Sequence, residues 1–217
     1  MSRLPRSFFS RYTPDVAKEM LGLVLVRAEQ GVMTSGRIVE TEAYRGRDDP
    51  ASHAYRGITK RTEMMFGEAG HAYLYFVYGN HYCLNVTTEQ DGEPGAVLIR
   101  AVEPIVGIGR MRERRGVEED RDLTNGPGKL TEAMSIGPSL HGEDMVTSRR
   151  LYLLAGKPGG PVSVSTRIGL SVARETMWRY FVESNPFVSR GRTHNYRKGR
   201  RGRNAGSSAS LVQASNR

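Results

Sequence analysis

The sequence predicts a single domain of the α+β class, and three observations support this class. Segments with the alternating or β-branched pattern of strands are spread over residues 1–188, whereas the helical segments are few and short. No internal repeat and no linker-like stretch divides this part of the chain. The 217 residues, of which 38% are hydrophobic, are enough to bury one sizeable core.

The N-terminal quarter is expected to form a helix followed by extended segments. Thr13-Pro14 is typical of a helix start, because proline suits the first turn, and Gly22 is typical of a helix end. The Val/Leu-rich segment Leu21–Arg27 leads to a turn at Gln30-Gly31. The alternation of apolar and polar residues over Gly36–Tyr44 predicts a strand.

A long loop and a hairpin are expected next. Arg45–Gly70 is polar and rich in glycine, and structured loops of this length in compact domains usually carry function. Two aromatic-rich strands follow, His71–Tyr78 and His81–Thr88, and Gly79-Asn80 between them is a strong hairpin signal. The remaining strands are expected at Ala96–Val102, Leu151–Ala155, Val162–Ile168 and Trp178–Val182, and helices at Pro104–Gly116 and Leu130–Ile136.

The net charge of +9 is concentrated at the C-terminal end. Residues 189–217 hold eight of the 32 basic residues and none of the 23 acidic ones, so residues 1–188 are nearly neutral. A segment rich in Arg, Gly and Ser cannot bury enough apolar surface to fold, so we expect a domain at 1–188 and a disordered basic tail at 189–217. Two interpretations of the tail stay open, a phosphate-binding arm that ignores base sequence and a solvated extension.

Several classes of protein are excluded by the composition. One cysteine, Cys83, allows neither an intrachain disulfide nor a cysteine-based zinc cluster, which favours a reducing compartment. No apolar run is long enough to span a membrane, and no signal peptide is recognisable. We therefore expect a cytoplasmic protein, at the nucleoid if its source is bacterial, without a membrane partner. The five histidines lack metal-ligand spacing, so no metal is expected.

Two acidic residues in the strand Gly36–Tyr44 are candidates for chemistry. Glu40 and Glu42 are two residues apart, so both should point to one face of the sheet, with Val39, Thr41 and Ala43 on the other. Neighbouring carboxylates repel each other, which raises the pKa of one of them unless an arginine compensates. One of the two could activate water as a general base, and the alternative is an ordinary solvated strand face.

The hairpin contains an unusual number of aromatic residues, in the sequence HAYLYFVYGNHYCLNV. Aromatic residues favour strands, so most of them could belong to an ordinary core. Tyr78 differs because it lies beside the turn, where side chains meet solvent. Proteins that open DNA push such side chains between base steps, and enzymes that act on a base must unstack it and hold it against aromatic faces.

The chain resembles the alkyladenine (3-methyladenine) DNA glycosylase family in four segments: VETEAYRGRDDPASHAYRG, MMFGEAGHAYLYFVYGNHYCLNV, VLIRAVEP and GPGKL. The similarity extends from about Thr13 to Ser189. It implies a curved, mostly antiparallel sheet with flanking helices and a protruding hairpin that enters the minor groove of DNA. It also implies a monomeric, cofactor-free enzyme of base excision repair, which hydrolyses the N-glycosidic bond of damaged purines in double-stranded DNA and leaves an abasic site.

The resemblance also assigns roles to single residues. Glu42, and not Glu40, matches the general base that activates water, and Arg100 matches an arginine that orders the site. The aromatic walls around the flipped base match three residues: Tyr44, His53 and Tyr75. Asn85 matches a residue whose amide crowds the 2-amino group of guanine.

DNA contacts outside the base pocket are implied as well. Tyr78 matches the side chain that intercalates into the vacated stack, and Thr59 and Arg61 lie in a loop that contacts the DNA backbone. The chain departs from the family pattern in this loop at Lys60, and at the hairpin tip, where Asn80 replaces a common methionine.

The hairpin register follows from the length of its turn. A two-residue turn at Gly79-Asn80 would place Tyr75 and Asn85 on opposite faces, although the family's pocket uses both. We therefore predict a bulge or a three-residue loop, Gly79–His81, which would pair Tyr75 with Asn85.

Three other functions remain open from the sequence. A carbohydrate hydrolase would need both Glu40 and Glu42. A non-catalytic nucleic-acid-binding domain would use only the hairpin and the basic tail. A family member that has lost its activity is the third possibility.

Overall fold

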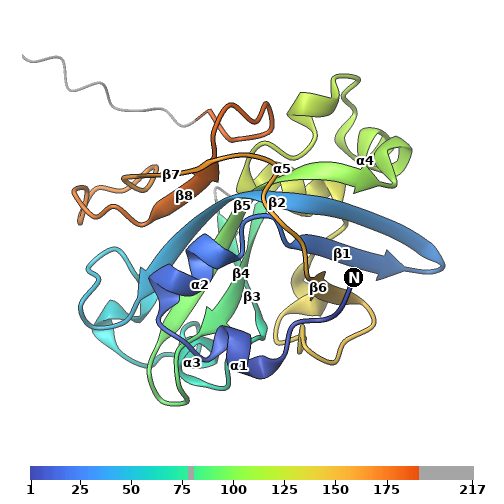
Figure 1. The fold of residues 1–217 in the computed structure, drawn as a ribbon. Coiled ribbons are helices and arrows are strands. Elements are labelled where there is room, and N and C mark those ends of the chain that lie inside the picture. Colours follow the sequence, from blue (N-terminus) through green and yellow to red (C-terminus); the bar gives the residue numbers. More distant parts are fainter. Residues whose placement is uncertain (78–80, 191–217) are drawn as a thin grey trace, which may run out of the picture.

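The computed structural model describes residues 1–77 and 81–190, and Figure 1 shows one curved sheet with short helices packed around it. Six of its eight strands follow the order β3-β4-β5-β2-β1-β6, and β8 pairs with β2 and with β7. Every pairing is antiparallel. The predicted α+β class with a curved antiparallel sheet is confirmed. The hairpin tip and the tail beyond Arg190 lie outside the described residues.

The elements are short except for two strands of the central sheet. The strands are β1 (Val24–Glu29), β2 (Val32–Arg45), β3 (Ala72–Val77), β4 (His81–Thr88), β5 (Gly95–Val106), β6 (Leu151–Leu154), β7 (Val162–Ser165) and β8 (Arg179–Val182). The α-helices are α1 (Arg6–Phe9), α2 (Thr13–Glu19), α3 (Glu63–Phe66), α4 (Ile108–Arg115) and α5 (Pro127–Ala133). Three 3-10 turns are η1 (His53–Arg56), η2 (Asp120–Asp122) and η3 (Pro138–Leu140).

The long strand β2 organises the sheet. Strand β5 pairs along one edge of β2, whereas the other edge is shared, with β1 on its first half and β8 on residues 40–42. The pairing with β5 shifts register between Ile38 and Glu40. Because of this bulge, Ile38 and Ala43 both pack in the main core, while Val39 packs in a separate cluster. The predicted strict alternation, with Val39 and Ala43 on one face, is therefore wrong.

The N-terminal expectations are largely confirmed. Helix α2 begins at Thr13 with Pro14 in its first turn, and β1 and β2 form a hairpin across Gln30-Gly31, whose φ angles of 48° and 80° suit the twist of the strands. Gly22, where φ is +89°, ends the helical region. A Cβ at Gly22 would lie 2.0 Å from the backbone nitrogen of Pro158, so no larger residue fits.

Several predicted boundaries are wrong, since β2 begins at Val32 instead of Gly36 and β7 ends at Ser165 instead of Ile168. Residues 104–106 extend β5, and helix α4 begins only after Gly107, whose left-handed conformation reverses the chain. Helix α5 begins at Pro127, three residues early, because proline is favoured in the first turn. The predicted loop Arg45–Gly70 contains the short helices η1 and α3.

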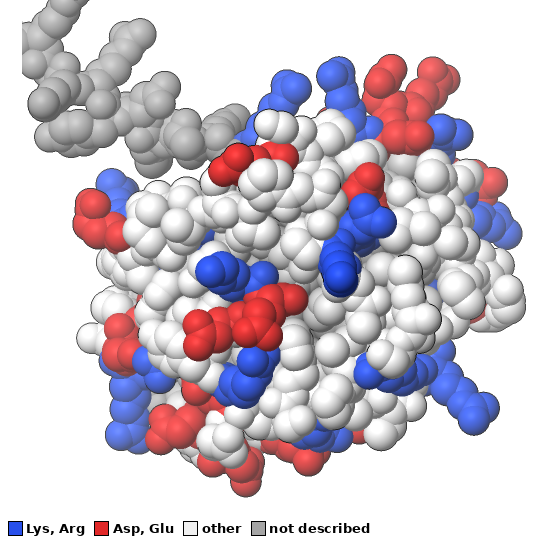
Figure 2. Space-filling model, viewed as in Figure 1, with Lys and Arg blue, Asp and Glu red and all other residues white. Residues whose placement is uncertain are grey.

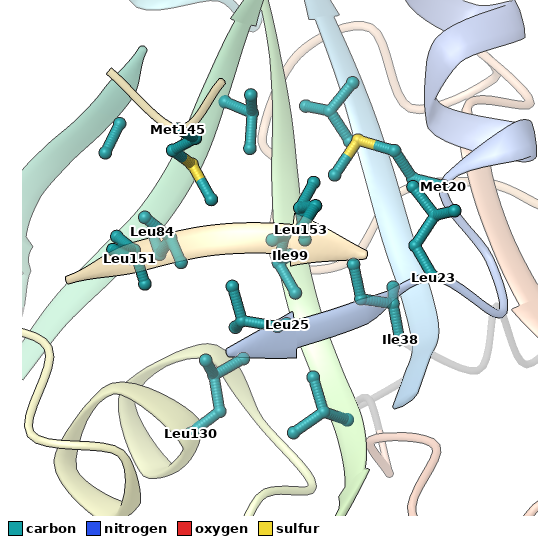
Figure 3. Close-up of a cluster of buried hydrophobic side chains, with 14 of the residues drawn as sticks. Met20, Leu23, Leu25, Ile38, Leu84, Ile99, Leu130, Met145, Leu151 and Leu153 are labelled. Atoms are coloured by element: carbon teal, nitrogen blue, oxygen red, sulfur yellow. The ribbon is translucent and has the colours of Figure 1, made fainter. Parts of the chain in front are cut away.

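The main core lies between the sheet and the helices, and Figure 3 shows side chains of β1, β2, β4, β5 and β6 meeting there. Leu25, Ile38 and Ile99 are fully buried on neighbouring strands, and Leu130 of α5 covers them. Burying one such side chain stabilises a fold by about 1.5–3 kcal/mol. This core holds the central strands, and with them the site described below, in one geometry.

The described surface carries both charges in mixture. Figure 2 shows basic and acidic side chains lying next to one another on the face in view. Exposed ion pairs include Arg11–Glu19 and Arg112–Asp120, both at 2.8 Å. Exposed pairs of this kind contribute little to stability. No helix in the described ranges is long and apolar enough to cross a membrane. The boundary between domain and tail at 188/189 stays a prediction, although Ser189 is itself buried.

Candidate active site

A pocket of about 110 Å³ opens beside the aromatic strand β3. Five separate parts of the chain line it, namely β2, the segment 45–70, the β3–β4 pair, β5 and the connection between β7 and β8. Its lining residues are Tyr44, Ala51, His53, Met65, Tyr73, Tyr75, Asn85, Ala96 and Leu170. The four residues that the resemblance assigned to base binding thus line one pocket.

The register of β3 and β4 brings Tyr75 and Asn85 to the pocket. Tyr75 pairs with Cys83, and Tyr73 pairs with Asn85, so the predicted pairing of Tyr75 with Asn85 is wrong by two residues. A shift of two keeps every side chain on its face, which is why Tyr75 and Asn85 still share one. The Asn85 amide donates to the carbonyl oxygen of Tyr73 at 3.1 Å, which fixes it in the wall.

Glu42 lies fully buried behind the Tyr44 wall of the pocket. Its Oε2 accepts hydrogen bonds from the Tyr44 hydroxyl at 2.8 Å and from Nη1 of Arg100 at 3.1 Å. Its Oε1 accepts one from the backbone N–H of Ile168 at 2.7 Å. Burial and the adjacent carboxylate raise the pKa of Tyr44 well above its ordinary value. The phenol therefore stays protonated and acts as the hydrogen-bond donor to Glu42. Three donors leave Glu42 with acceptor capacity to spare.

Arg100 holds both candidate carboxylates at once. Its Nε donates to Oε1 of Glu40 at 2.9 Å, while Nη1 donates to Glu42. The shared arginine confirms that Glu40 and Glu42 face the same way. Burial works to lower the pKa of Arg100, but the charges of Glu42 and Glu40 raise it above its ordinary value. Arg100 therefore stays charged and compensates the repulsion between the two acids.

Glu40 is saturated with donors. Besides Arg100, the Nε of Arg179 donates to it at 2.7 Å, and the backbone N–H and hydroxyl of Ser189 donate at 2.7 and 2.8 Å. Burial alone would raise the pKa of Glu40, but the two guanidinium groups and the Ser189 hydroxyl hold it below its ordinary value. Glu40 is thus a fixed anion and is not poised as the second acid that a carbohydrate hydrolase needs.

His53 stands at the mouth of the pocket in its neutral form. Desolvation of the ring and the charge of Arg61 lower the pKa of His53 to about 4. Arg61 Nη2 lies 3.2 Å from Nε2, and the Tyr73 hydroxyl lies 3.1 Å from Nδ1. Because a guanidinium can only donate, we assign the imidazole proton to Nδ1, which then donates to Tyr73. The ring meets Tyr75 edge-on, with 4.6 Å between the ring centroids.

The residues assigned to DNA outside the pocket have different positions. Thr59 is bonded within its own loop, since its backbone N–H donates to the Thr62 hydroxyl at 2.8 Å. The Arg61 guanidinium lies over the Tyr75 ring, 5.6 Å from its centroid, as well as beside His53. Contacts of Thr59 and Arg61 with the DNA backbone stay predictions. Tyr78, the predicted intercalating residue, lies outside the described residues.

An ion pair that the sequence reasoning missed fixes one wall of the site. Arg167 is buried and donates to both carboxylate oxygens of Asp49, at 2.6 and 2.7 Å, and to the carbonyl of Ala43 at 2.9 Å. Its guanidinium also stacks on the Tyr44 ring, 4.7 Å from the centroid. This pair anchors the segment that carries Ile168 against Glu42. Asp49 and Arg167 are 118 residues apart, so no local motif could have linked them.

Two minor expectations concern cysteine and metals. Cys83 is buried, and burial raises the pKa of its thiol, which suits a small core residue better than a nucleophile. Within residues 1–77 and 81–190, no group of three His, Cys, Asp or Glu side chains is arranged to hold a metal ion. The absence of a metal or other cofactor stays a prediction.

A buried carboxylate behind an aromatic pocket, on a curved antiparallel sheet, fits an enzyme that takes a flat ring into a cavity and acts beside it. Comparisons with known proteins sharpen this class. The sequence matches the family described as methylpurine-DNA glycosylase (MPG) over residues 7–186. The chain belongs to this family, as its resemblance predicts. It is a DNA glycosylase, a hydrolase of N-glycosyl bonds that acts on DNA in the base excision repair of alkylation damage.

Curated relatives support the family over nearly the whole chain. A protein of Chlorobaculum parvum named "Putative 3-methyladenine DNA glycosylase" is 47% identical over 191 residues, which cover 87% of this chain and 91% of the relative. Proteins of the same name from Carboxydothermus hydrogenoformans and Methanoculleus marisnigri are 46% and 45% identical, and the matched regions cover 86% of this chain and 98% of each relative. The alternatives of a carbohydrate hydrolase and a non-catalytic binding domain gain no support.

Proposed function

We propose that this protein removes alkylated or deaminated purines from double-stranded DNA, with 3-methyladenine as its typical base and hypoxanthine and ethenoadenine as further candidates. The damaged nucleotide flips out of the duplex, and Tyr78 fills the space that it leaves. The product is an abasic site. The protein acts as a monomer in the cytoplasm, at the nucleoid if its source is bacterial. The observation that carries the proposal is the buried Glu42 carboxylate bonded to the Tyr44 wall of the pocket.

The pocket favours cationic purines over neutral ones. Alkylation at N3 or N7 leaves a positively charged base, which aromatic faces attract. This attraction contributes about 1–2 kcal/mol in a desolvated site. Arg167 and Arg61 lie over one face of the Tyr44 and Tyr75 rings, so the base would stack on the opposite faces. The neutral state of His53 adds to the preference, because a charged imidazolium would repel the base. Weak pairing of damaged bases lowers the cost of flipping and adds further selectivity.

Glu42 is the general base in this mechanism. A water held by its free acceptor position attacks C1′ of the deoxyribose and gives its proton to the carboxylate. The electrons of the N-glycosidic bond leave with the purine, and for an alkylated purine they neutralise the positive charge that the base already carries. A neutral purine such as hypoxanthine must also take up a proton as it leaves, which solvent water supplies. Arg100 fixes Oε2 of Glu42 and the Ile168 N–H fixes Oε1, so the base is oriented before the substrate enters.

The absence of a lysine among the described pocket residues supports the monofunctional reaction. A glycosylase that also cuts the strand needs an amine nucleophile, which forms a Schiff base with the sugar. None of the residues that line the described pocket carries an amine. Water activated by Glu42 therefore takes the place of the nucleophile.

A base-release assay with Glu42→Gln tests the proposal. The substrates are a duplex with one hypoxanthine or ethenoadenine and, separately, methylated DNA, each followed by alkali to cut abasic sites. Wild type should release the base, and Glu42→Gln should be at least about 100-fold slower, because the general base is lost while the shape is kept. DNA binding should survive in the variant.

Glu103→Gln is the matched control, since Glu103 lies on β5 in a half-exposed pair with Arg37, away from the pocket. It should retain the wild-type rate. Equal rates for Glu42→Gln and wild type would overturn the role of Glu42. Binding without release of any base by the wild type would indicate a family member that has lost its activity.

A further inference from the structure

The C-terminal end of the described chain contributes a buried side chain to the charged cluster behind the pocket. Ser189 is 8% exposed, although the sequence places it at the start of the basic tail. Its hydroxyl donates to Oε1 of Glu40 at 2.8 Å and its backbone N–H donates to Oε2 at 2.7 Å. The two residues are 149 positions apart, so the last described residues are fastened to the strand that carries Glu42.

Arg100 distributes its donors over three different groups. Nε donates to Glu40 at 2.9 Å, Nη1 donates to Glu42 at 3.1 Å, and Nη2 donates to the Ser189 hydroxyl at 3.4 Å. A guanidinium is planar and rigid, so two of these contacts fix the direction of the third. Glu40 and Ser189 together fix the plane of the Arg100 guanidinium, and in this plane Nη1 points at Glu42.

Arg179 secures the same arrangement from the opposite side. It donates through Nε to Oε1 of Glu40 at 2.7 Å and through Nη1 to the Ser165 hydroxyl at 2.9 Å. Its strand, β8, pairs directly with residues 40–42 of β2. With two arginines against two carboxylates the cluster is electrically balanced, which a buried charge group requires.

We propose that Ser189 and Glu40 are positioning residues of the glycosylase, which act through Arg100 to hold the Glu42 carboxylate in its reactive orientation. The inference rests on the proposed role of Glu42 as the base. It extends the functional chain beyond the pocket into the C-terminal segment that follows β8. Neither residue touches the substrate, and each acts only through the guanidinium that it orients.

The test is the single-turnover rate constant of base release, measured with saturating enzyme on the hypoxanthine duplex. This rate constant does not depend on the fraction of enzyme that is folded, so a loss of stability alone leaves it unchanged. Ser189→Ala and Glu40→Gln should each lower it about 10- to 100-fold, the range expected when a reacting group is misplaced. Ser189→Thr keeps the hydroxyl and should recover most of the rate.

The pH profile separates orientation from a structural role. The Ser189 hydroxyl helps to keep the pKa of Glu40 low, so its removal should let Glu40 take a proton at higher pH. The acidic limb of the rate profile should therefore move to higher pH in Ser189→Ala. Ser35→Ala is the control, because Ser35 is buried on the same strand and makes no contact with the cluster, and its profile should match the wild type.

The outcomes are distinguishable from a failure of the proposed function. If Glu42→Gln is inactive while Ser189→Ala and Glu40→Gln keep the wild-type rate and pH profile, the positioning role is overturned, whereas the role of Glu42 as the general base is retained. If Glu42→Gln itself remains active, the general base is misassigned and the positioning role falls with it. Slower rates with a shifted acidic limb in Ser189→Ala, and recovery in Ser189→Thr, support both the general-base role of Glu42 and the positioning role of Ser189 and Glu40.

Discussion

The two sides of the pocket differ in how firmly the fold holds them. The charged side consists of Glu40, Glu42 and Arg100 on the central strands β2 and β5, and both carboxylates are fully buried. The aromatic side comes mostly from η1 and from β3, which ends the strand path, joined by Tyr44 at the end of β2, and it includes the exposed side chain of His53. Buried charges need complete partners, since one that loses its partner costs several kcal/mol. An aromatic wall needs only to admit and release a flat ring.

This difference predicts two kinds of defect. Changes on the charged side should damage stability and activity together, because the same contacts hold the fold and orient the base. Changes on the aromatic side should damage activity more than stability.

Removal of the shared arginine should have the largest effect. Arg100→Met would leave Glu42 without a charged partner and Glu40 with Arg179 alone, so that two neighbouring buried carboxylates repel each other, at a cost of about 3–5 kcal/mol in the free energy of unfolding. For a chain of this size that corresponds to a Tm lower by roughly 10 °C. Thermal and urea denaturation measure the change. Arg110→Met is the control, because Arg110 forms one exposed pair with Glu113 on α4 and should shift stability by less than about 0.5 kcal/mol.

Equal Tm values for Arg100→Met and Arg110→Met would contradict the description of the charged side as a structural unit. A double variant, Arg100→Met with Glu40→Leu, sharpens the comparison. It removes the repulsion between Glu40 and Glu42 and should regain part of the lost stability without regaining activity.

The aromatic wall should respond differently. Tyr75→Ala removes a stacking face worth about 1–3 kcal/mol per base, so base release under limiting enzyme should fall roughly 5- to 150-fold. The loss should be greater for methylated purines than for hypoxanthine, since only the former are cations. Tyr75→Phe keeps the ring and should stay near the wild type. If Tyr75→Phe were as defective as Tyr75→Ala, the hydroxyl and not the ring would matter.

His53 should make stability depend on pH. Its pKa is lowered to about 4 in the fold, whereas an unfolded histidine titrates near 6.5. Between these values the unfolded state binds the proton first, so the wild type loses stability as the pH falls from 6.5 to 4. His53→Asn should remove this part of the slope, and urea denaturation from pH 4 to 8 measures it. Parallel curves for the two proteins would mean that the folded and unfolded pKa values agree.

The smallest effect is expected from the basic segment after Arg190. Deletion of residues 191–217 spares Ser189 and should make DNA binding less sensitive to salt, because each phosphate contact adds about 0.9 to the slope of log K against log salt. Base release at low salt should be unchanged. An unchanged slope would instead identify a solvated extension.

Local sequence patterns were sufficient to predict the fold class and much of the pocket. Thr13-Pro14 and Gly116 marked helix ends, and the hairpin pattern placed β3 beside β4. The resemblance, and not the spacing, selected Glu42 over Glu40. The bulge after Ile38 was missed because bulges depend on the partner strand. The register error of two residues arose because the requirement that Tyr75 and Asn85 share a face is met equally by registers two residues apart.

The contacts that fix the carboxylates of Glu40 and Glu42 could not be predicted from local patterns. Arg167 and Ser189 look like unremarkable positions in the sequence, and each meets a partner more than 100 residues away. Tyr73 was visible as one of several hairpin aromatics, but its contact with His53 depends on how the segment 45–70 folds back over β3. Only the assembled sheet brings these groups together.

The late pairing of β8 with the middle of β2 has a consequence for how the protein is made. Residues 40–42 emerge from the ribosome early, but Arg179 and Ser189 follow 139 and 149 residues after Glu40. Until then, that half of the β2 edge lacks its β8 partner, and such edges are prone to association with other chains. Pairing over so long a separation is slow, because a long loop must close before any contact forms. We expect the nascent chain to acquire its activity abruptly, once β8 and Ser189 have emerged.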